Sequence, residues 1–143
     1  MNAPDDSDSY QPPISEDLAA QPVSRYMTKK VVTTTPSTNV KTAIGMLLSQ
    51  QVSALPVVDA KGVCIGVFSE FDAIIQGAST SLDEPIKYSK NPVTVFDDTR
   101  FRDALIMLLS KRIKRLPVVD ITGKLLGVIS RADFLKAIFA SQK

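Results

Sequence analysis

The chain has 143 residues and contains no histidine, no tryptophan and a single cysteine. Histidine is the commonest general base and metal ligand, so its absence removes the usual candidates for acid–base catalysis and for a metal centre. One cysteine excludes an internal disulfide and supplies too few ligands for a zinc site. Cys64 lies between Val63 and Ile65, where a thiol acts as a small hydrophobic side chain. The composition therefore argues against an enzyme, because it offers no nucleophile–base pair.

Long apolar runs and a strong charge imbalance are also missing. No hydrophobic stretch approaches the ~18 residues of a membrane span. Residues 1–8 are acidic and lack an apolar segment, which is unlike a signal peptide. We therefore expect a cytoplasmic protein without membrane contact. The net charge of +2 gives little support for nucleic-acid binding.

The first 22 residues differ in composition from the rest of the chain. They combine five acidic residues with prolines at positions 4, 12, 13 and 22, and they show no hydrophobic period. Such a segment buries too little apolar surface to fold alone, so we expect residues 1–22 to form a disordered arm. Within it, Ser15–Ala20 has the pattern of a short helix that would form only if it docks on the folded part.

The most informative feature of the sequence is an internal repeat. Leu-Pro-Val-Val-Asp occurs at 55–59 and again at 116–120, and a Gly-hydrophobic-x-Ser-x-x-Asp motif occurs at 66–72 and 127–133. Both pairs are 61 residues apart, so one supersecondary unit is used twice. We place the repeats at 23–80 and 81–140. Units of roughly 55 residues bury little surface alone, so we expect them to share a core.

Each repeat predicts the order strand, helix, strand, strand, helix. In repeat 1, apolar residues recur at helical spacing from Val40 to Leu48, after a break at Pro36–Thr38 that offers an N-cap. The turn Asp59–Gly62 predicts a hairpin with positive φ at Gly62. Repeat 1 also contains predicted strands at 31–34, 54–58 and 64–68 and a helix after Ser69. Residues 77–84 form the predicted connector. Repeat 2 contains predicted strands at 93–96, 116–119 and 125–129, a helix at 101–109 and a final helix.

These features resemble a tandem pair of CBS domains, the cystathionine β-synthase motif, also called a Bateman module. The resemblance covers 23–140 and is carried by Met27-Thr28 together with the two duplicated motifs. It implies an α+β fold in which two β-α-β-β-α repeats pack through their sheets with pseudo-twofold symmetry. It also implies a non-catalytic regulatory module that binds an adenine nucleotide of the AMP, ADP or ATP class between the repeats and signals to a partner protein.

The Ser-x-x-Asp element has two interpretations that share one geometry. A serine at the N-cap with an acid three residues later is a capping box. The same helix N-terminus presents free amides and a hydroxyl to a phosphate, while a carboxylate accepts hydrogen bonds from ribose hydroxyls. The resemblance implies that Ser69 and Ser130 contact phosphate and that Asp72 and Asp133 hold ribose.

The repeats differ just before the Leu-Pro strand. Repeat 2 has Lys114-Arg115 where repeat 1 has Ser53-Ala54, and the resemblance implies that these two cations contact phosphates. We therefore expect unequal clefts, with the main nucleotide site at Ser130 and Asp133.

The base contacts of that main site are expected from repeat 1, through Val31, Val52 and Ser53. The cleft of Ser69 and Asp72 is expected to be the weaker phosphate site. It would take S-adenosylmethionine or adenosine, or stay empty, with Lys114 possible there as the counterpart of Ser53.

Two other functions stay open. A structural or oligomerisation module with vestigial sites would dimerise through apolar side chains of the last helix of each repeat; these are Phe71, Ile74, Ile75, Phe134, Leu135 and Ile138. Alternatively, the cluster Lys111, Arg112, Lys114 and Arg115, with Arg100 and Arg102, would bind nucleic acid, although no aromatic platform accompanies it.

Overall fold

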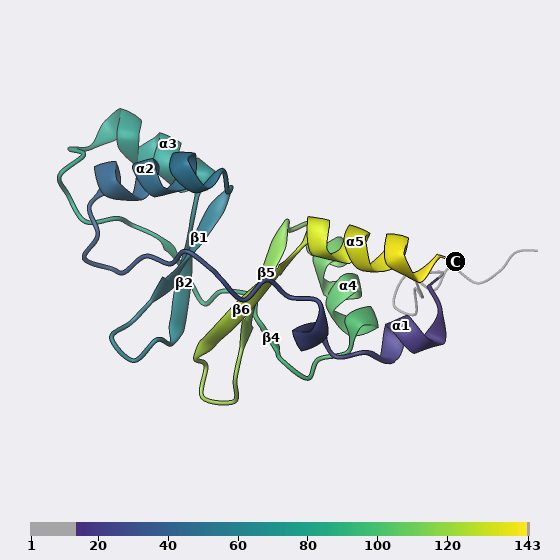
Figure 1. Cartoon of the computed structure of the whole chain (residues 1–143). Helices are drawn as coiled ribbons and strands as arrows, with labels where there is room; N and C mark the ends of the chain where they lie inside the picture. Colours follow the sequence, from purple (N-terminus) through teal and green to yellow (C-terminus); the bar gives the residue numbers. More distant parts are fainter. Residues whose placement is uncertain (1–13, 143) are drawn as a thin grey trace, which may run out of the picture.

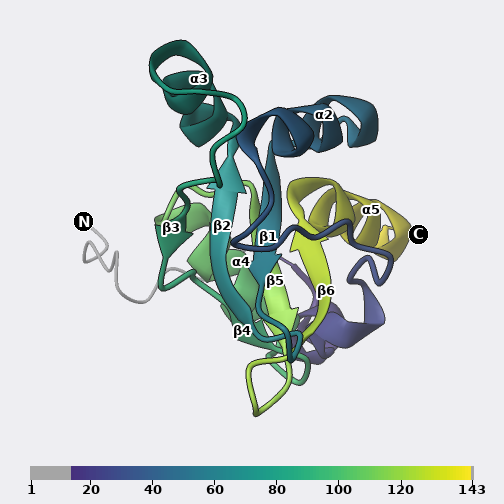
Figure 2. The same ribbon diagram turned by 90° about the vertical axis from the view of Figure 1, so that its left-hand side faces the viewer.

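A computed structural model describes residues 14–142, which form two lobes that lie side by side (Figure 1). Lobe 1 is a three-stranded sheet in the order β1-β2-β3, and lobe 2 a sheet in the order β4-β5-β6. The strands meet at the centre of the molecule, and two helices of each lobe lie away from the other lobe (Figures 1 and 2). The bounds are α1 Glu16–Ala20, η2 Val23–Arg25, α2 Val40–Gln50, β1 Ala54–Val58, β2 Cys64–Ser69, α3 Glu70–Ser79, β3 Ser89–Lys90, β4 Val95–Phe96, α4 Phe101–Ser110, β5 Arg115–Val119, β6 Leu125–Ser130 and α5 Arg131–Ser141.

The two long hairpins form as the sequence predicts. β1 pairs with β2 and β5 with β6, both antiparallel. Gly62 has φ 84° and its counterpart Gly123 has φ 89°, a conformation that glycine adopts without strain. Each turn is held by an aspartate at its start, since Asp59 Oδ1 accepts the Lys61 amide at 2.9 Å and Asp120 Oδ1 accepts the Thr122 amide at 2.9 Å.

The start of repeat 1 differs from the prediction in two places. The expected strand 31–34 is reduced to one parallel bridge, Thr34 with Val57, because only Thr34 exchanges hydrogen bonds with β1. The N-cap of α2 is Asn39, whose side chain accepts the Thr42 amide at 2.8 Å, and not a residue of 36–38. At the end of the repeat, α3 continues to Ser79, so part of the expected connector is helical.

The two lobes exchange their leading segments. β3, which precedes the first strand of repeat 2, pairs with β2 in lobe 1. Thr28, at the equivalent place before repeat 1, bonds to Val128 of β6 in lobe 2, with the amides of both residues donating at 2.8 and 2.9 Å. Each repeat in the sequence therefore contributes its first residues to the other repeat's sheet, which ties the lobes together.

The N-terminal helix corrects the expected disordered arm. α1 begins after the N-cap Ser15, and its Leu18 is buried in the core of lobe 2 beside Val23. The short helix expected to form on docking is therefore confirmed, and disorder is wrong for residues 14–22. Burial of Leu18, together with Ile14 packed against the same core, offsets part of the entropy of ordering this segment. Residues 1–13 of the arm lie outside the described residues.

Each lobe has its own hydrophobic core. Lobe 1 is filled mainly by aliphatic side chains around Leu55, Val57 and Phe68. Lobe 2 contains an aromatic cluster in which Phe101 meets Tyr26 and Phe134 edge to face, at centroid distances of 5.4 and 5.0 Å. The expectation of one shared core is thus wrong, because each sheet has its own pair of covering helices.

The lobes are related by a pseudo-twofold axis that passes between the hairpins. The Cys64 amide donates to the Gly123 carbonyl at 3.0 Å, and the Leu125 amide donates to the Gly62 carbonyl at 3.0 Å. Cys64 is equivalent to Leu125 and Gly62 to Gly123 in the repeat, so the two hydrogen bonds are equivalent to each other. The predicted α+β architecture of two sheet-packed repeats with pseudo-twofold symmetry is confirmed.

Candidate functional site

Two cavities lie between the lobes and are related by the same pseudo-symmetry. We call them the Ser69 cleft and the Asp133 cleft, and their volumes are about 480 and about 310 Å³. The Ser69 cleft is lined by Ser53, Ala54, Pro56, Val67, Ser69, Glu70, Phe71, Ser89, Lys90, Asn91, Pro92, Val93, Arg112, Ile113, Lys114, Arg115, Pro117 and Val128. The Asp133 cleft is lined by Thr28, Lys30, Val31, Val32, Gln50, Val52, Ala54, Pro56, Arg115, Val128, Ser130 and Asp133.

A helix begins at the edge of each cleft, and both starts form a capping box. Ser69 Oγ accepts the Asp72 amide at 3.1 Å, and Asp72 Oδ2 accepts the Ser69 amide at 2.9 Å. Ser130 and Asp133 repeat this arrangement at 3.4 and 2.9 Å. The capping interpretation of the motif is therefore confirmed in both repeats. Capping leaves the serine hydroxyl at the cleft surface, so it is compatible with a ligand.

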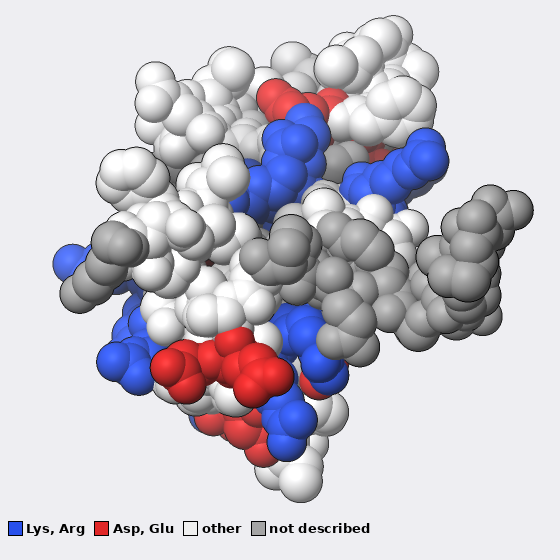
Figure 3. Space-filling model, turned by 90° about the vertical axis from the view of Figure 1, so that its right-hand side faces the viewer, with Lys and Arg blue, Asp and Glu red and all other residues white. Residues whose placement is uncertain are grey.

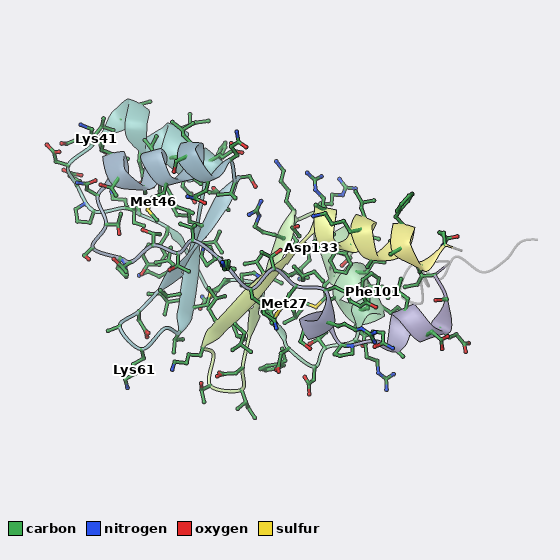
Figure 4. The ribbon with its side chains drawn as sticks, viewed as in Figure 1. Met27, Lys41, Met46, Lys61, Phe101 and Asp133 are labelled. Atoms are coloured by element: carbon green, nitrogen blue, oxygen red, sulfur yellow. The ribbon has the colours of Figure 1, made fainter. Side chains whose placement is uncertain are left out.

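The two aspartates differ in their remaining contacts. Asp133 also accepts hydrogen bonds from Thr28 Oγ1, at 3.2 Å to Oδ1 and 3.3 Å to Oδ2, and it is only 9% exposed. Figure 4 shows Asp133 where β6 runs into α5. Asp72 is half-buried, and within residues 14–142 its Oδ1 accepts no hydrogen bond. Asp72 therefore has an open carboxylate oxygen, whereas Asp133 is already bound to Thr28, in the leading segment of repeat 1 that packs on lobe 2.

Arg115 lies between the clefts and lines both of them. Its Nη2 donates to Ser53 Oγ of the other lobe at 3.3 Å, and its buried Nε has no hydrogen-bond partner among the described residues. Burial lowers the pKa of the Arg115 guanidinium, while the negative charges of Asp133 and Glu70 oppose that shift. A half-buried guanidinium with a free donor is suited to a bound anion.

The structure corrects the assignment of cations and base contacts to the clefts. Lys114 lines the Ser69 cleft and not the Asp133 cleft, and so does Ser53. Arg115, the residue after Lys114, lines both clefts, whereas Val52, the residue before Ser53, lines only the Asp133 cleft.

The other expected site residues are divided between the clefts. Val31, Val52, Arg115, Ser130 and Asp133 lie together around the Asp133 cleft, as expected. Ser69 lines the other cleft, and the Asp72 carboxylate bonds to it without lining the cavity itself.

The sequence did not single out several polar residues as cleft residues, among them Thr28, Lys90, Arg112 and Glu70. Thr28, the partner of Asp133, belongs to the Met27-Thr28 pair that marked the family resemblance. Lys90, Arg112 and Glu70 line the Ser69 cleft. The repeat offset could have identified Arg112 as a cleft residue. Arg112, Ile113 and Lys114 are the equivalents of Gln51, Val52 and Ser53, and two of these, Val52 and Ser53, were predicted to contact the base.

The outer helix faces are apolar but unequal. Phe71 and Ile74 of α3 are 72% and 69% exposed, and Leu135 and Phe139 of α5 are 68% and 83% exposed. Phe134 is not part of this surface, because it is buried in the lobe 2 core. A groove of about 490 Å³ between α2 and α3 is lined mostly by small and aliphatic side chains, with Glu70 at its edge.

Charged side chains are mixed on the α1/α5 end of the molecule. Figure 3 shows groups of Lys and Arg separated by Asp and Glu on that face, which gives no support to a nucleic-acid surface there. Within residues 14–142 no helix is long and apolar enough to span a bilayer. The same described residues hold no group of three metal-ligating side chains.

The fold, the duplicated motifs and the two interlobe clefts define a CBS-domain pair. The CBS domain family model matches residues 23–76 and 86–140, and the chain belongs to this family.

The curated relatives match this chain over only part of their own length. CBSX2, a chloroplastic CBS domain-containing protein of Arabidopsis thaliana, is 32% identical in a 133-residue alignment that covers 71% of this chain and 56% of that protein. The inosine-5′-monophosphate dehydrogenase of Methanocaldococcus jannaschii is 27% identical over 128 residues, 90% of this chain but only 26% of the enzyme. The chain thus spans about half of the first relative and a quarter of the second.

Solved structures agree with the fold. The crystal structure of CBSX2 in complex with AMP superposes with a TM-score of 0.79 and 29% identity, covering 86% of this chain and 99% of that one. The CBS domain pair of protein MJ0100, crystallised with 5′-methylthioadenosine and S-adenosyl-L-methionine, has a TM-score of 0.73 and 22% identity, covering 92% of this chain and 100% of that one.

Proposed function

We propose that this chain is a non-catalytic regulatory module that binds an adenine nucleotide, with the phosphate held in the Ser69 cleft. The observation that carries this proposal is the set of four cations, Lys90, Arg112, Lys114 and Arg115, that line the cleft where α3 begins after its N-cap Ser69. Helix N-termini and cations both attract phosphate. The Asp133 cleft is lined by two cations, Lys30 and Arg115, so our proposal places the phosphate in the other cleft from the one expected from the sequence.

The remaining parts of a nucleotide find suitable groups nearby. Asp72 has the open oxygen that a ribose hydroxyl needs, on the same helix turn as Ser69. Pro92 and Ile113, the pseudo-symmetric counterparts of Val31 and Val52, provide apolar contacts for a base. The smaller and less cationic Asp133 cleft, with Val31 and Val52, suits an adenosyl ligand with little negative charge, such as adenosine or S-adenosylmethionine.

The relatives support an adenosyl ligand in general. CBSX2, which shares 29% of its residues with this chain in the structural alignment, was crystallised with AMP. Binding would regulate a partner protein only if one conformation of the pair binds ligand better than another. A cleft formed by both lobes meets that condition, because a change in the angle between the lobes alters its shape.

The first test is a calorimetric titration of AMP, ADP, ATP, adenosine and S-adenosylmethionine. We expect AMP to bind the wild type, and Lys114→Gln and Asp72→Asn to weaken it about tenfold or more, which corresponds to ~1.4 kcal/mol. A thermal-shift series gives an independent readout, because ligand at 100 times its dissociation constant adds ~2.7 kcal/mol to stability.

Lys136→Gln is the matched control, since Lys136 is an exposed cation of α5 that lines neither cleft. AMP binding that survives both cleft variants and disappears in Asp133→Asn would return the main site to the Asp133 cleft. Binding of none of the five ligands would favour a structural module with vestigial sites.

We also infer that the apolar helix faces pair with a second copy of the chain, lobe 1 against lobe 2. Contiguous exposed apolar side chains mark interaction sites, and the charges beside them are reversed. Glu70 at the start of α3 corresponds to Arg131 at the start of α5. A head-to-tail dimer brings Glu70 of one copy towards Arg131 of the other, whereas a head-to-head dimer brings like charges together.

A charge exchange tests this orientation. In a head-to-tail dimer, Glu70→Arg and Arg131→Glu each weaken association, and the double variant recovers it; sedimentation equilibrium measures the dimer constant. In a head-to-head dimer each single variant only exchanges one pair of like charges for another, so neither single variant would weaken association. A wild type that stays monomeric at high concentration would overturn the dimer itself.

A further inference from the structure

The residues that the two clefts share suggest that they do not act independently. Four residues line both cavities, and Arg115 is the only charged one; the others are Ala54, Pro56 and Val128. We propose that Arg115 is a shared phosphate ligand that makes the clefts compete, so that a phosphate bound in one cleft weakens phosphate binding in the other. This inference rests on the proposed function and specifies how its sites are regulated.

The fold supplies this group once. Arg115 begins β5, and its counterpart at the start of β1 is Ala54, which lines both cavities but has no charge. Because the two positions are related by the pseudo-twofold axis, two arginines here would provide one for each cleft. A single guanidinium at this place has to serve both.

The Arg115 guanidinium has few fixed contacts, so it can turn from one cleft to the other. Its one hydrogen bond is the 3.3 Å contact with Ser53 Oγ, a hydroxyl that can rotate, and its Nε has no partner within residues 14–142. Among the same residues Arg115 forms no ion pair. Acidic groups act on it from each cleft, Asp133 from one and Glu70 from the other, while Arg131 repels it. No fixed carboxylate therefore anchors it in one cleft.

The expected sign of the coupling is negative. A phosphate takes a guanidinium most favourably through two parallel hydrogen bonds, which orient the planar group towards that phosphate. A second phosphate then meets a site that has lost its cation, and it is also repelled by the first across a low-dielectric interface. Adenosine has neither effect, since it lacks the phosphate.

Calorimetric titration of AMP into the whole chain tests the competition. Asp72→Asn and Asp133→Asn each weaken one cleft and leave the residues of the other unchanged, so the tighter binding step of each variant gives the affinity of its unaltered cleft. In the wild type we expect the second AMP to bind about 5- to 150-fold more weakly than to the corresponding single-cleft variant, the usual range of coupling between sites. Binding of one AMP by the wild type and two by Arg115→Gln is the extreme form of the same result.

Arg115→Gln should remove the coupling, so that both steps match the single-cleft constants obtained in that background. Arg112→Gln is the matched control: Arg112 is also a cation but lines only the Ser69 cleft, so its loss weakens one step and leaves the coupling. Circular dichroism verifies that each variant is folded, and adenosine titrated into the wild type should show independent steps.

The proposal is overturned if two AMP molecules bind the wild type with the single-cleft constants, or if coupling persists unchanged in Arg115→Gln. A wild type and an Arg115→Gln variant that both take up only one AMP overturn it as well, while the proposed function survives. Absence of AMP binding to every variant and to the wild type removes the proposed function itself.

Discussion

The two lobes have the same topology but are stabilised differently. In lobe 2, Phe101 and Phe134 are buried and meet edge to face, and α1 adds Leu18 to the core. The equivalent positions in lobe 1 are Val40 and Ala73, which are buried but small. Lobe 1 instead leaves an open groove between its helices. The duplication preserved the backbone plan, and side-chain volume then made lobe 2 the more extensively packed half.

The clefts show the opposite bias. The Ser69 cleft, at the start of α3 in lobe 1, has more cations, and the nearby Asp72 has an open oxygen, while the Asp133 cleft has its aspartate bound to Thr28. The less filled lobe is therefore beside the cleft that we propose for the phosphate. Stability and ligand chemistry have diverged separately between two copies of one unit.

The largest expected difference between the lobes concerns their cores. Phe101→Ala removes a fully buried aromatic ring that touches Tyr26 and Phe134, and we expect a loss of about 3–5 kcal/mol in the free energy of unfolding. Val40→Ala at the equivalent position removes fewer atoms and should cost less. Urea unfolding followed by circular dichroism measures both, and equal losses would contradict the difference in packing.

Because each leading segment packs against a glycine of the opposite lobe, we expect substitution of either glycine to lower the free energy of unfolding by a similar amount. A Cβ added at Gly66 would lie 2.5 Å from the Ser89 carbonyl oxygen, and one at Gly127 would lie 2.6 Å from the Thr28 carbonyl oxygen. Backbone cannot move away cheaply, so Gly66→Ala and Gly127→Ala should each cost about 1–3 kcal/mol. The same unfolding experiment tests them, with Gly45→Ala as control because its Cβ would meet open space. If either variant unfolds with the same free energy as the wild type, the leading segment does not pack against that glycine as described.

A smaller effect is expected from the bond between Thr28 and Asp133. Thr28→Val keeps the shape of the side chain and removes the hydroxyl that donates to the carboxylate; a loss of about 1 kcal/mol is typical for one such hydrogen bond. At the equivalent position, Ser89→Ala should be nearly silent, since none of the hydrogen bonds found for Asp72 within residues 14–142 comes from Ser89. Thermal unfolding of the two variants side by side tests this; equal shifts would remove the distinction between the aspartates.

The smallest effect concerns the thiol of lobe 1, which replaces Leu125 of lobe 2. Burial raises the pKa of the Cys64 thiol above its ordinary value of 9.0, partly opposed by its contact with the Gly66 carbonyl. Because the thiolate is disfavoured in the folded state, the contribution of Cys64 to stability is present below pH 9 and is lost as the pH rises through its folded pKa. Alkylation by iodoacetamide should therefore have a higher midpoint pH in the folded protein than in urea. Coincident midpoints would show that the thiol is solvated.

Local residue patterns predicted much of this structure. The hairpins, their positive-φ glycines and the capping boxes depend on residues within four positions of one another, so the sequence determines them directly. The same holds for the helical stripes from Val40 and from Phe101, because amphipathic spacing selects the face that packs on a sheet. The duplicated motifs were specific enough to indicate the family and its α+β architecture.

The allocation of side chains to clefts was less accessible. Lys114 and Arg115 were both assigned to the Asp133 cleft because the family resemblance implies phosphate contacts for the two positions, but Lys114 lines only the Ser69 cleft and Arg115 lines both. The sequence shows that the two cations are present and does not show which cavity each one reaches. Thr28 was recognised as part of a motif, yet its bond spans 105 residues to Asp133.

By itself, then, the sequence determined the repeated unit, its turns and caps, and the asymmetry of charge between Lys114-Arg115 and Ser53-Ala54. Only the tertiary structure decided that the leading segments cross to the opposite lobe, that α1 folds on lobe 2, and that one arginine is shared by both clefts. These features depend on contacts between residues far apart in the chain. Such contacts form where complementary surfaces meet, and local propensity does not specify which surfaces those are.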